Sequence, residues 1–398
     1  MIHLDAIGRL ERNTRRVAEV CSVAAKYGLA DWLKGIHYAR LQEWLQTGDG
    51  QAISSLSAPE RFRLALTELG TTYIKLGQML STRPDVVGEE VALELERLQT
   101  SVPADPPEVI TALVELELGK PLSELFREFD TTAFASASVA QVHRARLLTG
   151  ERVVVKVQRA KIEGEIQADL SILAGLAELA EEHVSALKVY GPVALVRQFH
   201  QTLLAELDFS HERRNLDEFR RNFAADRTVH FPRPWPEYSS RRVLTMEYLE
   251  GILGSDLDQL KAANVDLQAF ARRGADLYLE MIFRDSFYHA DPHPGNLMLL
   301  PGSVVGVLDC GMTGRLDEAL REEIESLVLA IAQKDPSALT DAVWNLSVLP
   351  PICQRGQLQA DLADFVAEYT GPTLVEFDLK GALRNLTDII HRHHILLP

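Results

Sequence analysis

Three side chains in the C-terminal part of the chain have the types and the spacing to do phosphate chemistry. The stretch HADPHPGN, residues 289–296, places Asp291 and Asn296 five residues apart in a segment that contains two prolines and a glycine. Asp309 follows directly behind the apolar run VVGVL, which predicts the end of a buried strand. Asn296 and Asp309 offer the oxygen ligands that Mg²⁺ prefers, and Asp291 can orient a hydroxyl or a water for attack. The pattern therefore indicates a site for a magnesium-bound nucleotide.

The combination is more specific than its parts. An Asp-Pro turn or an aspartate at the end of a strand is an ordinary structural feature when it occurs alone. The spacing here matches the kinase pattern HRDxxxxN followed by DFG, with Ala290 and Cys310 in place of the Arg and the Phe. The sequence thus favours a catalytic over a purely structural interpretation.

A lysine upstream can contact the phosphates. VVVKVQ, residues 153–158, places Lys156 inside an apolar, β-branched run, where an unpaired charge is costly to bury. An edge-strand lysine that faces solvent is the alternative, and taken alone the two interpretations are about equal. The stretch LLAELDFSHERRN supplies Glu206, Asp208 and Glu212 as acidic partners. We expect one helix here, with Asp208 and Glu212 on one face, and which acid pairs with Lys156 stays open.

Two further segments have the residue types of a nucleotide pocket. The turn FASASVAQVH precedes the lysine strand and has small residues where kinases have glycines, so its backbone is more restricted than a glycine loop. TMEYLEG, residues 245–251, has the character of a hinge whose backbone binds adenine. The residues predicted to bind nucleotide here are Ala135, Ser136, Ala137, Ser138, Val139, Glu247 and Tyr248.

Composition narrows the class of protein. The chain has 398 residues, 46% of them hydrophobic and 25% charged, with a net charge of −16, which disfavours nucleic acid as a partner. Its three cysteines are far apart, which fits a reducing compartment. No apolar run reaches the length of a membrane span. The chain stops at HRHHILLP, just as a new apolar segment begins, and we expect a truncated C-terminus.

The elements that position these residues follow from the periodicity. Residues 9–46 read as helical, and Ser57 with Glu60 predicts a capped helix that runs to about Ser81. Helices are expected at 86–98, 107–118, 161–225 and 266–285, and again beyond Arg315. Strands are expected around Thr149-Gly150, in 231–251 and in 286–311. We divide the chain into residues 1–58, 59–125, 126–250 and 251–398: N-terminal helices and linker, a helical extension, a small β-rich lobe and a larger lobe.

Together these motifs resemble the UbiB family, also called aarF-domain-containing kinases. The resemblance runs from about residue 60 to the C-terminus, and its motifs are KLGQ, the alanine-rich loop, VVVK, ELD, HADPHPGN and LDCG. Ser136 is a departure, since the family more often has alanine there. The resemblance implies an α+β, atypical protein-kinase-like bilobal fold with a helical N-terminal extension that carries the KxGQ motif.

The resemblance also assigns roles. It implies that the extension folds over the cleft, that Lys75 meets Glu206 and Asp208, and that Glu212 pairs with Lys156. Lys75, Lys156 and Asp291 would be catalytic, and Gln78 and the three acids would contact nucleotide. Asn296 and Asp309 would hold Mg²⁺ on ATP or ADP.

The activity implied by the resemblance is that of an ATPase, or of a kinase that acts on a small or lipid-like substrate. The family supports ubiquinone, other prenyl-quinone or lipid metabolism. It implies prenyl-quinone precursors, membrane lipid and quinone-biosynthesis proteins as partners. The expected location is cytoplasmic, peripheral to the inner membrane or anchored to it through a C-terminal segment that this chain lacks.

Two other functions stay open. One is a pseudokinase scaffold that senses nucleotide and binds lipids or partner proteins without turnover. The intact set of Lys156, Asp291, Asn296 and Asp309 counts against it. The other is a small-molecule phosphotransferase of the choline or aminoglycoside kinase type, which HADPHPGN also fits. The KxGQ segment and the alanine-rich loop count against that class.

Overall fold

The structure is a computed structural model that describes residues 13–29, 56–98, 104–184, 188, 190–291, 293–346, 354–369, 379–393 and 395. The chain divides into two compact units. Unit 1 comprises Met1–Thr100, Gly164–His200 and Glu322–Pro398, and unit 2 comprises Ser101–Glu163 and Gln201–Arg321. Most of the expected helix at 9–46 and of the linker that follows it lies outside the described residues.

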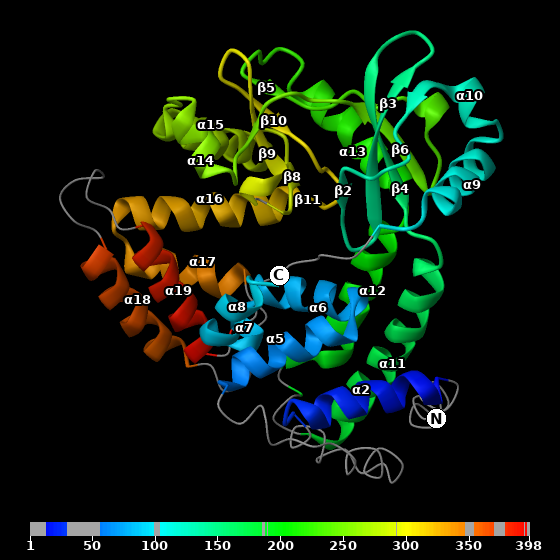
Figure 1. The fold of residues 1–398 in the computed structure, drawn as a ribbon. Coiled ribbons are helices and arrows are strands. Elements are labelled where there is room, and N and C mark those ends of the chain that lie inside the picture. Colours follow the sequence, from blue (N-terminus) through cyan, green and yellow to red (C-terminus); the bar gives the residue numbers. More distant parts are fainter. Residues whose placement is uncertain are drawn as a thin grey trace. The chain divides into compact units, whose positions relative to one another are not determined.

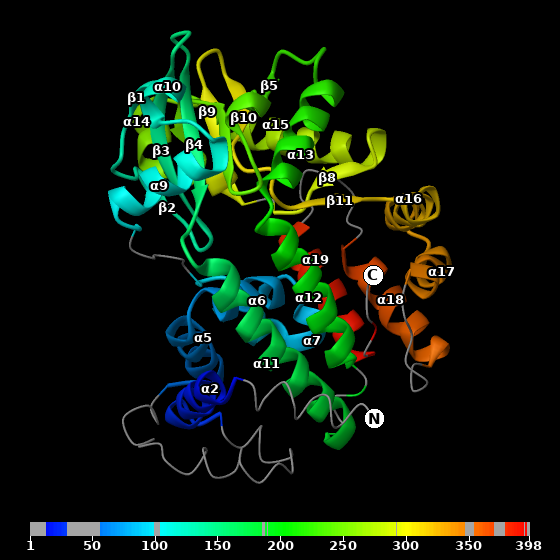
Figure 2. The same cartoon turned by 90° about the vertical axis from the view of Figure 1, so that its right-hand side faces the viewer.

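Unit 1 is helical where it is described (Figures 1 and 2). Its N-terminal helices are α2 (Thr14–Lys26), α5 (Ala58–Leu69), α6 (Thr71–Ser81), α7 (Pro84–Val87) and α8 (Glu89–Leu95). The predicted cap of α5 is confirmed, because the Ser57 hydroxyl accepts from the Glu60 amide and the Glu60 carboxylate accepts from the Ser57 amide. The prediction of one helix to Ser81 is wrong. Gly70, with φ 94°, separates α5 from α6, and a glycine adopts this left-handed backbone conformation without steric strain.

The other helices of unit 1 come from later in the chain. They are α11 (Ile162–His183), α12 (Pro192–Glu206, whose last turns belong to unit 2), α16 (Glu318–Gln333), α17 (Pro336–Leu346), α18 (Arg355–Tyr369) and α19 (Leu379–Arg392). Leu339, Leu358 and Ile389 belong to the apolar core that α16 to α19 share. Arg16 of α2 pairs with the buried Asp169 of α11 at 2.7 Å and donates to the Leu69 carbonyl, so it fastens three segments together. No described helix combines the length and the apolar character that a bilayer crossing requires.

Unit 2 is built around an antiparallel sheet that carries Lys156. Its strands are β1 (Phe126–Phe129), β2 (Ala135–Ser136), β3 (Ala140–Leu147), β4 (Arg152–Gln158) and β6 (Val243–Glu247). The order is β1-β3-β4-β6, with β2 paired to β3. β4 is therefore flanked on both sides, and Lys156 is not on an edge strand.

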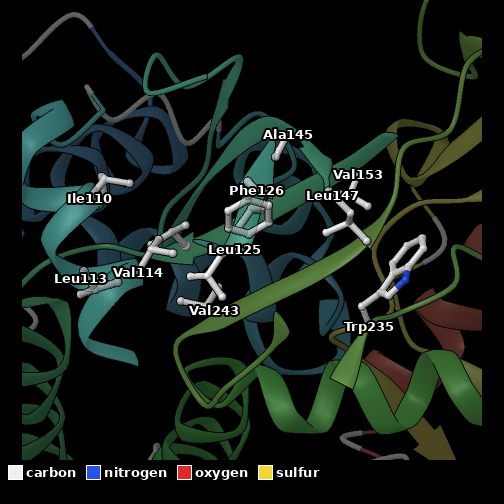
Figure 3. Close-up of a cluster of buried hydrophobic side chains, with 12 residues drawn as sticks. Ile110, Leu113, Val114, Leu125, Phe126, Ala145, Leu147, Val153, Trp235 and Val243 are labelled. Carbon is white, nitrogen blue, oxygen red and sulfur yellow. The ribbon is translucent and has the colours of Figure 1, made fainter. Parts of the chain in front are cut away.

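The two faces of this sheet have different neighbours. Val153, Val155 and Val157 of β4 point into an apolar cluster with Ile110 and Val114 of α9 (Pro107–Leu118), as Figure 3 shows for most of its members. Since side chains alternate along a strand, Arg152, Val154, Lys156 and Gln158 face the other way. α13 (Phe209–Asn222) supplies the partner of Lys156 on that face. The short helix α10 (Leu122–Leu125) leads into β1.

The remaining strands of unit 2 flank the HADPHPGN and LDCG motifs. β5 (Val229–His230), β10 (Val304–Val307), β9 (Leu297–Leu300) and β7 (Ile252–Leu253) form one sheet in that order. β8 (Phe287–His289) pairs with β11 (Thr313–Arg315). The helical segments here are η3 (Pro236–Tyr238), α14 (Leu257–Ala262), α15 (Leu267–Leu279), the π-helical turn η4 (Glu280–Arg284) and η5 (Pro294–Asn296).

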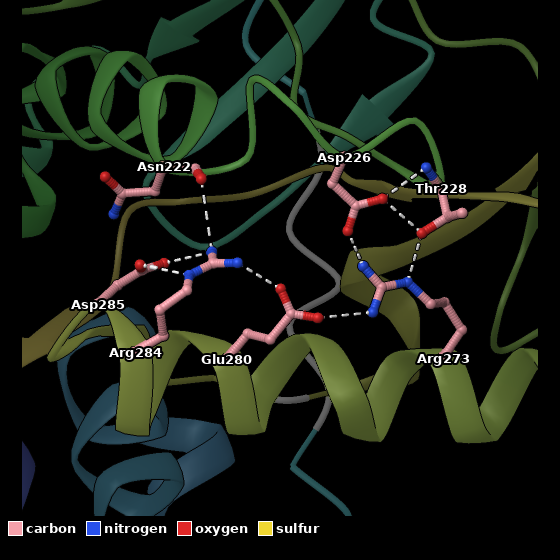
Figure 4. Close-up of polar contacts among 7 residues, drawn as sticks. All are labelled: Asn222, Asp226, Thr228, Arg273, Glu280, Arg284 and Asp285. Carbon is pink, nitrogen blue, oxygen red and sulfur yellow. Dashed lines mark hydrogen bonds and ion pairs between the residues drawn. The ribbon is translucent and has the colours of Figure 1, made fainter.

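A charged network joins α15 and η4 to the end of α13 (Figure 4). Arg273 contacts Asp226 and Glu280, and Arg284 contacts Glu280 and Asp285. Arg284 also donates to the carbonyl of Asn222, the last residue of α13. Because β8 follows η4 directly, the network fixes the start of the HADPHPGN segment relative to α13.

Candidate active site

Lys156 forms two ion pairs in the structure. Its Nζ lies 2.8 Å from Glu212 Oε2 of α13 and 3.1 Å from Asp309 Oδ2 in the segment that follows β10. The side chains of Lys156 and Glu212 are 12% and 3% exposed, whereas that of Asp309 is 48% exposed. The ammonium also lies over the Phe209 ring, 5.4 Å from its centre. The structure thus brings a lysine and two acids, far apart in sequence, to one position.

The surroundings set the protonation of these groups. Burial alone would lower the pKa of Lys156, but the carboxylates of Asp309 and Glu212 raise it, so the lysine is charged. Burial likewise opposes ionisation of Asp309, but the lysine charge and the Gly311 amide, 2.8 Å from Oδ1, hold the pKa of Asp309 below its ordinary value. Burial and the neighbouring Asp309 charge raise the pKa of Glu212 to about 7. Lys156 thus has two carboxylate partners, and the surroundings favour the ionised form of Asp309 more than that of Glu212.

Asp291 and Asn296 form a second cluster. The Asn296 amide nitrogen donates to Asp291 Oδ2 at 2.8 Å and to the Asp291 carbonyl at 3.2 Å. The Asp291 amide donates to Nδ1 of the buried His289 at 3.0 Å, so the other ring nitrogen, Nε2, carries the proton and donates to the Asp309 carbonyl. His289 therefore connects the segment of Asp291 to that of Asp309.

The two expected magnesium ligands lie at one end of a pair of neighbouring strands, with Asn296 just before β9 and Asp309 just after β10. β9 and β10 pair antiparallel, and Val307 is opposite Leu297. One step further, the Leu308 amide donates to the Asn296 carbonyl at 2.9 Å. Asn296 and Asp309 are thus adjacent at the end of this strand pair, as their spacing led us to expect.

One face of α13 contacts several parts of the site. Glu212 pairs with Lys156, the Asn215 amide donates to the Cys310 carbonyl at 2.9 Å, and Phe219 stacks on Phe287 with ring centres 4.5 Å apart. These positions are three and seven residues beyond Glu212, so they lie on one helix face. α13 therefore orients the segment after Asp309 and the strand before Asp291 together.

The helix predicted for LLAELDFSHERRN is in fact two helices. α12 ends at Glu206, and Asp208 is the N-cap of α13, where its Oδ1 accepts from the Ser210 amide at 2.9 Å. Asp208 and Glu212 therefore do not share a helix face. Aspartate is one of the preferred N-cap residues, and this preference explains the break.

The alanine-rich loop lies at the end of the lysine strand. The Ala137 amide donates to the Ala140 carbonyl at 2.8 Å and closes the turn, and the Arg159 amide donates to the Val139 carbonyl at 3.0 Å. Ser138 and Val139 are 3% exposed. Arg159 Nη1 also donates to Ser136 Oγ at 3.3 Å. The Ser136 hydroxyl therefore helps to hold the loop in place. Ala135 pairs with Val142 in the sheet.

The hinge residues continue β6. The Glu247 carboxylate accepts from His230 Nε2 at 2.9 Å and from the Arg233 amide at 3.1 Å, so its side chain is engaged. The Tyr248 amide donates to the Arg152 carbonyl, and its ring lies beside the guanidinium groups of Arg144 and Arg152. The Glu247 amide also donates to the Arg233 carbonyl at 2.9 Å, and adenine binding by this segment stays a prediction.

Lys75 and Gln78 lie on α6 in unit 1, whereas Glu206 and Asp208 belong to unit 2. Both residues of the KxGQ motif are half-buried. The Gln78 amide donates to the Leu98 carbonyl at 3.5 Å within unit 1. The contact of Lys75 with the two acids stays a prediction.

The residues present fit a magnesium nucleotide. Among the described residues, no group of three or more His, Cys, Asp or Glu side chains could enclose a metal. Mg²⁺ in phosphate sites is usually held by one or two protein groups together with phosphates and water. The half-exposed Asp309 carboxylate and the side-chain amide oxygen of Asn296 match this pattern. Glu212 Oε1 is buried and has no hydrogen-bond partner in the described part of the chain, which leaves an acceptor for a ligand or its water.

Reasoning from sequence missed three supporting residues. His289 joins the segments of Asp291 and Asp309, Asn215 contacts the Cys310 carbonyl, and Gln158 donates to the Leu207 carbonyl. Periodicity would have found two of them. Gln158 is two residues beyond Lys156 on a strand, and Asn215 is three beyond Glu212 on a helix, so each shares a face with a predicted site residue.

A lysine strand paired to a helix glutamate, with HxDxxxxN and DxG segments joined by a histidine, defines an atypical protein-kinase-like protein. The model of the ABC1 atypical kinase-like domain matches residues 97–343. The chain therefore belongs to the ABC1 atypical kinase-like family.

Named relatives agree with this assignment. A probable protein kinase UbiB of Pseudomonas paraeruginosa is 36% identical over 335 residues, which is 81% of this chain and 62% of that protein. The UbiB of Azotobacter vinelandii is 36% identical over 87% of this chain and 66% of its own length. An uncharacterised Synechocystis protein is 35% identical over 99% of this chain and 68% of its own length. The chain thus spans less than two thirds of the UbiB protein from P. paraeruginosa.

A solved structure shows the same fold. It is the complex of Rv3197 with erythromycin from Mycobacterium tuberculosis, with a TM-score of 0.54 and 21% identity. The likeness covers 80% of this chain and 87% of that one. The α+β, kinase-like fold class is therefore confirmed.

Proposed function

We propose that this chain binds ATP or ADP with Mg²⁺ and either hydrolyses ATP or transfers phosphate to a small or lipid-like substrate. The observation that carries the proposal is the convergence of Lys156, Glu212 and Asp309, with His289 linking Asp309 to Asp291. A buried lysine with two acids is expensive to maintain for stability alone. The family membership supports the same conclusion.

The chain's own residues divide the work. Lys156, held by Glu212, would bind the α and β phosphates. Asp291, whose carboxylate is fixed by the Asn296 amide, would orient the attacking hydroxyl or water. Asn296 and Asp309 would hold Mg²⁺, which neutralises charge on the phosphates when it is bound. The loop from Ala135 to Val139 would cover the phosphates.

The KxGQ helix suggests which acceptors are excluded. We propose that Lys75 meets Glu206 and Asp208, that Gln78 contacts nucleotide, and that the extension keeps protein substrates from Asp291. A small or lipid-like acceptor, in prenyl-quinone or lipid metabolism, then suits the site better than a protein. The resemblance to the UbiB family is the basis of this role, and we propose association with the inner membrane and with quinone-biosynthesis proteins on the same basis.

Nucleotide-dependent thermal stability tests the proposal. We would measure melting with ATP and with ADP, each with and without Mg²⁺, for the wild type and for Asp309→Asn. A ligand at 100 times its dissociation constant adds about 2.7 kcal/mol, which gives a clear shift in melting temperature. We expect a Mg²⁺-dependent shift in the wild type and its loss in Asp309→Asn, because the variant lacks a charged metal ligand.

The matched control is Asp317→Asn. Asp317 directly precedes α16, and its Oδ1 accepts from the Leu320 amide in the first turn of that helix. The variant therefore removes one carboxylate charge outside the site. It should keep the nucleotide shift. Equal shifts in wild type and Asp309→Asn would contradict the assigned metal site. Binding without any ATP turnover would favour the nucleotide-sensing scaffold.

A further inference from the structure

We propose that Gln158 is a positioning residue that sets the place of Glu206 and Asp208 relative to Lys156. The proposal rests on the proposed function only where nucleotide is concerned. The structural coupling itself can be tested without any ligand.

Gln158 occupies the same strand face as Lys156. It lies two positions further along β4, at the end of the strand, and is 1% exposed. Its Nε2 donates to the Leu207 carbonyl at 2.9 Å, and its Oε1 accepts from Arg242 Nε at 2.6 Å. An arginine can only donate and a carbonyl can only accept, so the two partners fix which way the amide points.

The Leu207 carbonyl lies between two helices, where no helical hydrogen bond is available to it. α12 ends at Glu206 and α13 begins after its cap Asp208, so Leu207 is in the break between the two helices. Carbonyls at helix C-termini lack helical partners and need another donor. Gln158 supplies that donor in the described structure.

The acids on either side follow the Leu207 backbone. Glu206 and Asp208 are its direct neighbours, so a shift of the Leu207 peptide also displaces the Cα atoms that carry both side chains. Asp208 Oδ1 is already held by the Ser210 amide, and the Phe209 amide donates to the Arg241 carbonyl. Gln158 adds the link that ties this segment to the lysine strand. It does not touch a reacting group itself.

Hydrogen exchange of the whole chain, without nucleotide, tests the coupling. Gln158→Met keeps the length of the side chain and removes both hydrogen bonds. We expect exchange in a peptide spanning residues 203–210 to be faster by about tenfold, the change that corresponds to one lost hydrogen bond. Gln158→Glu at pH 8 keeps an acceptor for Arg242 and lacks the donor to Leu207, so we expect the same local change in exchange.

Gln141→Met is the matched control. Gln141 is a fully buried glutamine of the neighbouring strand β3, it faces the opposite side of the sheet, and it contacts the Asp105 amide and His143. Its substitution should leave exchange at 203–210 unchanged. Unchanged exchange in Gln158→Met, or an equal rise in Gln141→Met, would overturn the proposal.

A nucleotide titration adds the functional readout. At fixed Mg²⁺, we expect Gln158→Met to need several-fold more ATP than wild type for half of the melting shift, because Glu206 and Asp208 are expected to contact nucleotide, while Gln141→Met needs the same. An equal requirement in Gln158→Met and wild type would show that the position of the acids does not matter to the nucleotide, against the proposal. If the wild type shows no shift at all, the proposed function fails, and the exchange experiment still decides the coupling.

Discussion

Gly77, between Lys75 and Gln78 of the KxGQ motif, is expected to be required for packing. A Cβ at this position would lie 2.3 Å from Leu98 Cδ1 and 2.8 Å from Leu66 Cδ1. Both leucines are buried, so they must shift to admit even a methyl group. Overpacking of this kind costs about 1–3 kcal/mol. Alanine in a helix interior recovers about 1 kcal/mol relative to glycine. We therefore expect Gly77→Ala to lower the free energy of unfolding by up to about 2 kcal/mol.

Urea unfolding of matched variants measures this effect. Gly164 is a helical glycine of α11 with no heavy atom within 4 Å of the position of an added Cβ. Gly164→Ala should be neutral or stabilising, because only the helix propensity changes. The double variant Gly77→Ala/Leu98→Ala removes the closest clash, so Gly77→Ala should be less harmful in that background, with a coupling of about 1–2 kcal/mol.

Two results would refute the steric account of Gly77. Gly77→Ala could stabilise the protein as Gly164→Ala does, or the two changes in the double variant could be additive. Either would show that the leucines adapt freely. A confirmed clash would instead show that the glycine of the motif allows α6 to pack closely against Leu66 and Leu98. This packing role would be distinct from the roles proposed for Lys75 and Gln78.

Two further predictions concern buried charge. Lys156→Met leaves Glu212 and Asp309 without their cation. A broken buried pair typically costs about 3–5 kcal/mol, and we expect a loss near or below the lower end of this range because Asp309 is half exposed. We also expect the variant to lose the nucleotide-induced melting shift. A variant with wild-type stability and a wild-type shift would contradict the assigned contacts. Burial lowers the pKa of His143, so the folded protein holds it neutral while the unfolded chain, with a pKa near 6.5, takes up a proton below that pH. Stability should therefore fall as the pH drops from 7.5 to 5.5, and His143→Leu should remove up to about 1.4 kcal/mol per pH unit of that slope in unfolding measurements, whereas an unchanged slope would assign it to other groups.

Local signals predicted the elements whose causes are local. The cap at Ser57, the helix at 107–118 and the two strands around Thr149-Gly150 were predicted from capping pattern and period, and the structure has all of them. The break at Gly70 was missed. A single glycine inside a helical pattern lowers helix stability by only about 1 kcal/mol, so packing between α5 and α6 decides whether the chain bends there.

The acids near Lys156 show where sequence reasoning runs out. Glu206, Asp208 and Glu212 are equally plausible partners when the stretch is read as one helix. Asp208 instead caps a new helix, and only then does Glu212 reach Lys156 at 2.8 Å. The cap preference of aspartate was visible in the sequence. The apolar pattern LLAELDF has a helical period that continues across the break, so the stretch looks like one helix and the cap was not recognised.

α13 connects the lysine strand to the segments of Asp309 and Asp291. The helix begins at the Asp208 cap, pairs with Lys156 through Glu212, and ends where Arg284 holds the Asn222 carbonyl. A rigid helix that is fixed at both ends moves as a unit, so a shift at its start also moves the residues along its face that contact the segments of Asp309 and Asp291. Gln158 acts on the peptide just before that start. We therefore expect the distance between the lysine strand and α13 to affect how Lys156, Asp309 and Asp291 are placed. Two residues of that strand make the relevant contacts, Lys156 with Glu212 and Gln158 with the Leu207 carbonyl.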